Sequence, residues 1–338
     1  MSVERAAHLR HPSDRAPSVP VDQGLLRALI GDGRPALSLT AVALLLSGLF
    51  AIFLSFRREF LPHDVGYLAM SADELCRVAD CRVVRFMFHD RVAFGGTLIA
   101  IAVLYFWLAA FPLREGAVWA WWAFVVSGVL GFASFLAYRG YGYLDVWHAV
   151  ATLALLPTFA VGLWFSRPLA NIRQMPWITS ADMKTADWRS RIGRWGLLVT
   201  GLSLALAGTV ILYLGSTEVF VAEDLGFMGL DRQRLDEVNP RLVPLIAHDR
   251  AGFGGGLATI GVLLTAAAVY ARPSRAFHEA VAIAGLAGFG CAIGTHFVEG
   301  YLNPVHLAPA FAGLALFGAS IVCEITGSRA QTTRWDFR

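Results

Sequence analysis

The chain has 338 residues, of which 56% are hydrophobic and 16% are charged. Soluble domains carry about 25% charged residues, so this composition excludes an ordinary soluble protein and favours one that lies in a lipid bilayer. The formal net charge of +3 is too small to indicate a nucleic-acid partner.

The chain opens with about 35 mostly polar residues, and it lacks the short basic start and cleavage site of a signal peptide. A membrane-spanning helix needs about 20 largely apolar residues. Eight segments meet this requirement: 36–56, 92–112, 117–138, 146–166, 195–215, 251–271, 276–297 and 304–325. Because lipid offers no hydrogen-bond partners to the backbone, we expect each of them to be helical. The sequence therefore predicts an all-α, multi-pass membrane protein.

The basic residues predict the orientation. The segment 167–194 carries Arg167, Arg173, Lys184, Arg189, Arg191 and Arg194, and cytoplasmic loops are enriched in Lys and Arg. Both termini are then cytoplasmic, and the expected location is the cell (inner) membrane. The predicted organisation is a largely disordered tail (1–35), a four-helix unit (36–166), a basic linker (167–194), a second four-helix unit (195–325) and a cytoplasmic tail (326–338).

The two units share three short motifs in the same order, which predicts an internal duplication. The motifs are HDRVAFGG at 89–96 and HDRAGFGG at 248–255, DVGYL at 64–68 and DLGFM at 224–228, and GYLDVWH at 142–148 and GYLNPVH at 300–306. Because each unit has an even number of spans, the two copies would be parallel and related by an axis along the membrane normal. Nearly all of the repeated polar residues then lie at the extracytoplasmic face.

Four repeated histidines are candidate metal ligands: His89, His148, His248 and His306. Imidazole binds transition-metal ions and also titrates near neutral pH. The adjacent candidates for catalysis are Asp90, Asp249, Arg91 and Arg250, with the two acids orienting the histidines. The same motifs also allow a purely structural role. The acids can cap helix starts, the arginines can reach the membrane surface, and the histidines can bind loop backbone.

Further candidates lie in the same predicted layer. Asp64 and Asp224 either join the histidines or cap short helices at the membrane surface. His296 and Glu299 have the i, i+3 spacing that places both side chains on one helix face. Cys76 and Cys81 lie in an extracytoplasmic loop, where a disulfide is the favoured hypothesis.

These features leave three functions open. The first is a metal-dependent or redox enzyme that acts on a lipid, a quinone or another small molecule at the outer face. The second is a transporter or ligand-binding protein that uses histidine protonation, which would need a polar route to the cytoplasm. The third is a membrane scaffold without catalysis. Whether the protein is an enzyme is not decided by the sequence.

Overall fold

The computed structural model describes residues 30–79, 81–136, 143, 146–170 and 187–335. Within these ranges every regular element is a helix. Eight of the described helices are long and apolar enough to cross a membrane, so the chain is of the multi-pass helical membrane type. The predicted tail 1–35 and linker 167–194 fall largely outside the described residues.

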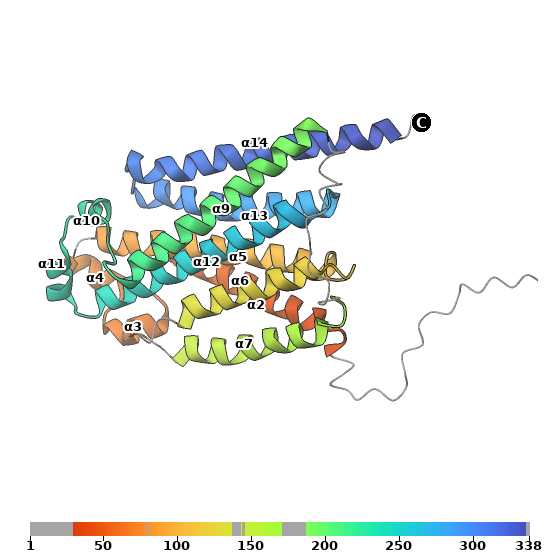
Figure 1. The fold of residues 1–338 in the computed structure, drawn as a ribbon. Coiled ribbons are helices and arrows are strands. Elements are labelled where there is room, and N and C mark those ends of the chain that lie inside the picture. The colour runs from red at the N-terminus through yellow and green to blue at the C-terminus, as the bar shows by residue number, and fades with distance from the viewer. Residues whose placement is uncertain (1–29, 80, 137–142, 144–145, 171–186, 336–338) are drawn as a thin grey trace, which may run out of the picture.

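The long helices run roughly along one common direction (Figure 1). They are α2 (Arg34–Arg57), α5 (Cys81–Ala110), α6 (Val118–Leu136), α7 (Val146–Ser166), α9 (Trp188–Ser216), α12 (Leu242–Tyr270), α13 (Arg275–Glu299) and α14 (Pro304–Trp335). Four short helices gather at one end of the bundle, which we call the short-helix end. They are α3 (Pro62–Leu68), α4 (Ala72–Ala79), α10 (Ala222–Met228) and α11 (Arg232–Val238).

Two helices begin well before the apolar segments that predict them. The predicted spans start at 92 and 251, whereas α5 starts at Cys81 and α12 at Leu242. The alternative in which Asp90 and Asp249 cap helix starts is therefore wrong, because both lie inside continuous helices. Apolar length detects only the part of a helix that crosses the bilayer, and the first turns of α5 and α12 carry polar residues whose partners are other protein segments.

The helices α5 and α12 form the centre of the bundle, since about two thirds of each apolar window is buried. Each of them packs on a helix from the other half of the sequence: α5 on α13, and α12 on α6. Close backbone approach tightens the pairing of α12 with α9, where a Cβ on Gly254 would come 2.3 Å from the Leu212 nitrogen. The two halves of the sequence are thus interleaved.

The buried apolar side chains form two clusters. One fills the middle of the bundle and includes Leu104, Phe124, Leu264 and Phe277. The other lies under the short helices, where Phe86, Phe88, Leu75, Tyr143 and Tyr301 are almost fully buried. The side chains of this second cluster enclose the polar residues at the short-helix end.

A separate polar cluster lies at the opposite end of the bundle. Glu324 of α14 is fully buried, and its carboxylate accepts hydrogen bonds from Arg194 Nε and Ser190 Oγ, both at 2.7 Å. Arg194 also donates to the carbonyls of Ala267 and Ala268 near the end of α12. One arginine therefore joins α9, α12 and α14.

Replacing Arg194 by Met should destabilise the protein by about 3–5 kcal/mol, because the buried Glu324 carboxylate loses its charged partner. The measurement is chemical unfolding of the purified protein in mixed micelles. Arg191→Met is the matched control, since Arg191 lies on the exposed face of the same helix. Equal stability of the two variants would contradict a structural role for the Arg194–Glu324 pair.

Candidate metal centre

A chain of buried polar contacts joins the two halves of the sequence at the short-helix end. Tyr301 Oη donates to Asp224 Oδ1 at 2.9 Å, and Arg250 forms an ion pair with the other oxygen of Asp224. Arg250 Nε also lies 3.5 Å from Asp90 Oδ2, and Asp90 Oδ1 lies 3.0 Å from His89 Nδ1. The order is tyrosine, aspartate, arginine, aspartate, histidine.

A second chain has the same order of residue types. Tyr143 Oη donates to Asp64 Oδ1 at 2.7 Å. Arg91 contacts Asp64 Oδ2 at 2.7 Å and Asp249 Oδ2 at 2.9 Å. His248 Nδ1 lies 3.0 Å from Asp249 Oδ1. In both chains an arginine forms ion pairs with an aspartate of its own half and an aspartate of the other half.

Three histidines come together at the end of the first chain. His89, His296 and His306 each offer one ligand atom, and these atoms lie within 4.8 Å of one another. The Nε2 atoms of His89 and His296 are 3.0 Å apart. His89 and His296 are buried, whereas His306 is half-buried. The group takes its members from α5, α13 and α14, and so from both halves of the chain.

Local structure explains how His296 and His306 reach the group. Helix α13 ends at Gly300, whose φ of 75° lies in the left-handed region that glycine tolerates. The turn lets the backbone nitrogen of Tyr301 bond the His296 carbonyl at 3.0 Å. Asn303 Oδ1 then accepts from the backbone nitrogens of Val305 and His306, which caps the start of α14 and fixes His306 in its first turn.

The hydrogen bonds of the rings determine which nitrogen of each histidine can bind an ion. His89 Nδ1 faces the Asp90 carboxylate, and His296 Nδ1 lies 2.8 Å from the Tyr301 carbonyl. Both of these oxygens accept hydrogen bonds, so in each neutral ring Nδ1 carries the proton and Nε2 carries a lone pair. Two such lone pairs at 3.0 Å repel each other unless a proton or a metal cation lies between them. Together with His306, these nitrogens could hold a transition-metal ion, which histidine binds at about 2.1 Å.

Among the described side chains, the fold brings together only two of the four histidines that the sequence predicts as metal ligands. Of the four repeated histidines, His89 and His306 join the group with His296, a candidate that the helical spacing with Glu299 indicates. His248 packs against Tyr143 with ring centroids 4.9 Å apart, in the second chain. The side chain of His148 lies outside the described residues. The metal assignment stays a prediction.

The other predicted site residues have defined contacts. Asp90, Asp249, Arg91 and Arg250 form the ion pairs of the two chains. Asp64 belongs to the second chain, while Asp224 both pairs with Arg250 and accepts from the Val221 nitrogen at the start of α10. Glu299 is buried and pairs with Arg58. Cys76 and Cys81 are joined by a disulfide that links α4 to the start of α5.

Sequence reasoning missed the two tyrosines. Tyr143 and Tyr301 occupy the same position of the repeated GYL motif, and each donates to the repeated aspartate of its own half. The sequence shows that the two tyrosines occupy equivalent positions in the repeat. It does not indicate a role in the site, because a tyrosine beside an apolar helix usually anchors the membrane interface. The interaction with a distant aspartate depends on the folded structure.

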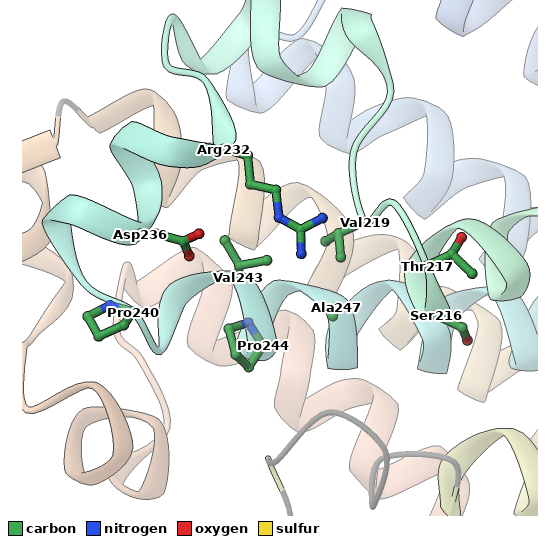
Figure 2. Close-up of a pocket in the computed structure, with 9 residues that line it drawn as sticks. All are labelled: Ser216, Thr217, Val219, Arg232, Asp236, Pro240, Val243, Pro244 and Ala247. Carbon is green, nitrogen blue, oxygen red and sulfur yellow. The ribbon is translucent and has the colours of Figure 1, made fainter.

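A separate cavity of about 240 Å³ lies between the end of α9, α11 and the start of α12 (Figure 2). It is lined by Ser216, Thr217, Val219, Arg232, Asp236, Pro240, Val243, Pro244 and Ala247. None of these is a histidine, and the two charged residues sit on the exposed helix α11. The cavity is therefore distinct from the three-histidine group.

Comparisons with models of known protein families, with curated proteins and with solved structures find no match. The fold and the site define a multi-pass helical membrane protein with a buried histidine cluster at the short-helix end.

Removing the disulfide with Cys76→Ser and Cys81→Ser should lower the free energy of unfolding by about 2 kcal/mol, because the bond closes a short loop in the unfolded chain. The measurement is unfolding in mixed micelles. The free thiol Cys323 provides the control as Cys323→Ser. An unchanged stability of the double variant would show that the disulfide does not constrain the unfolded chain.

Proposed function

We propose that this protein binds a transition-metal ion through His89, His296 and His306 and that it is a metal-dependent membrane enzyme. The observation that carries the proposal is the arrangement of the rings. Two buried imidazoles present Nε2 atoms to each other at 3.0 Å while their Nδ1 atoms are held by acceptors, and a third imidazole lies within reach.

The surroundings of the histidines support this proposal. Histidines that bind metals commonly donate the other ring N–H to a carboxylate or a backbone carbonyl, which fixes the tautomer. His89 has the Asp90 carboxylate in this position, and His296 has the Tyr301 carbonyl. Three protein ligands leave at least one coordination position for a water molecule or a substrate. A bound ion would supply Lewis-acid or redox chemistry there.

The polar residues lie in two clusters at opposite ends of the bundle, and this separation favours an enzyme over a transporter. A transporter needs a polar route between the two ends of the bundle. The apolar cluster in the middle of the bundle lies between the histidine group and the Arg194–Glu324 pair among the described residues. The substrate we infer is a small molecule, a quinone or a lipid that reaches the short-helix end from the membrane or its surface.

We further propose that the chain arose by duplication of a four-helix unit and that the histidine group faces the extracytoplasmic side of the inner membrane. The two chains of tyrosine, aspartate, arginine, aspartate and histidine support the duplication. The basic segment 167–194 supports cytoplasmic termini. The disulfide in the same layer as the histidines fits an oxidising compartment.

The metal proposal predicts about one transition-metal ion per chain in the wild-type protein, and loss of most of it in His89→Ala, His296→Ala or His306→Ala. Each change removes one of three ligands. The measurement is elemental analysis after dialysis of the purified protein against a fixed concentration of Zn²⁺ or Co²⁺.

Two controls separate this site from other possibilities. His278→Ala removes a histidine near the opposite end of α13 and should keep the metal. His248→Ala should keep it as well, because His248 lies in the second chain. Equal metal loss in His248→Ala and His296→Ala would favour the four repeated histidines as ligands, and a metal-free wild-type protein would exclude the proposal.

The proposed orientation predicts that a fluorescent protein fused after Arg338 folds and fluoresces, whereas a periplasmic phosphatase fused at the same position is inactive. A fusion within the loop between α10 and α11 should give the opposite result. The reverse pattern would place the histidine group on the cytoplasmic side.

A further inference from the structure

We propose that Tyr301 is the positioning residue of the metal centre, and that its backbone carbonyl and its phenol together orient two of the three ligands. The inference rests on the proposed metal site. It assigns a separate role to a residue that binds no metal itself.

The backbone of Tyr301 orients His296. The Tyr301 carbonyl accepts from His296 Nδ1 at 2.8 Å, and the Tyr301 nitrogen donates to the His296 carbonyl at 3.0 Å. The two residues therefore hold each other across the left-handed turn at Gly300. This reciprocal contact directs Nε2 of His296 toward His89.

The phenol of Tyr301 orients His306. Its single proton goes to Asp224, because an ionised carboxylate can only accept. The phenol oxygen then accepts from His306 Nδ1, which lies 3.4 Å away, and Nε2 of His306 is left with its lone pair.

The ring of Tyr301 is held firmly enough to perform this role. It is 1% exposed. It stacks on Phe227 with centroids 4.6 Å apart, and its centroid lies 5.5 Å from that of His89 and 5.3 Å from that of His296. Packing on all sides restricts the rotamers of this side chain, as a positioning group requires.

The polar contacts that continue from Tyr301 through Asp224 fix the positions of the histidines and do not form a path for proton transfer. Asp224 leads to Arg250, Asp90 and His89, so the chain returns to the first ligand. Arginine does not release its proton in proteins, which interrupts any transfer along this path. The closed circuit instead fixes the positions of His306 and His89 relative to each other.

Tyr143 provides a matched comparison. It donates to Asp64 as Tyr301 does to Asp224, and its ring contacts His248. It lies in the second chain, away from the three-histidine group. Replacing either tyrosine by Phe removes one buried hydroxyl and one bond to an aspartate, so the two variants should lose similar stability.

The test is titration of metal-free wild-type protein, Tyr301→Phe and Tyr143→Phe with Co²⁺, following the visible absorption of the bound ion and the thermal stability of each apo-protein. Loss of a residue that orients a ligand typically weakens metal binding about 10–100-fold. We expect this loss, with a changed absorption spectrum, in Tyr301→Phe alone. The backbone contact to His296 remains in that variant, so binding should be weakened and not abolished.

The outcomes separate this inference from the metal proposal. If Tyr301→Phe binds Co²⁺ with wild-type affinity and spectrum while His296→Ala does not bind, Tyr301 has no positioning role and the metal proposal stands. Equal weakening by Tyr301→Phe and Tyr143→Phe also overturns the inference, since it would reflect a general loss of packing. Absence of Co²⁺ binding in the wild-type protein overturns both.

Discussion

The pairing of two arginines, one buried and one partly buried, with aspartates from both halves of the chain is the constraint on which the short-helix end depends. A buried ion without a partner costs several kcal/mol, and Arg91 and Arg250 each find two carboxylates. These pairs fix α5 against α12. They also leave the second oxygen of Asp90 and of Asp249 to hold a histidine. Stability and the orientation of the imidazoles therefore come from the same contacts.

Most of the helices could be predicted from the sequence, because apolar length is a direct requirement of the bilayer. The starts of α5 and α12 could not, since polar residues such as Asp90 are tolerated inside a helix when other protein segments supply their partners. The repeat drew attention to His89 and His306. It could not give their partner His296, which has no histidine at the equivalent place in the first half, nor the tyrosine that holds it. Those contacts join residues far apart in the chain and depend on the packing of α13 on α5.

The two chains of polar contacts have the same residue types but different surroundings. Around His89 the second half contributes two more histidines. Around His248 the described residues contribute a tyrosine ring. A framework that holds one imidazole by one carboxylate is thus present twice, and two further histidines lie beside only one of these imidazoles among the described residues. The two chains of contacts therefore differ in the side chains around their histidines and not in the order of their own residues.

The interleaving of the halves has a consequence for how the protein is made. Synthesis delivers α5 to the membrane long before α12, α13 and α14. Arg91 already has Asp64 of its own half, but Asp90 must await Arg250. Until then an acid in α5 lacks its arginine in a low-dielectric setting, where such groups are costly. The histidine group itself closes only when α14, which carries His306, has been inserted. A chain that stops before α13 therefore contains His89 of the group but neither His296 nor His306.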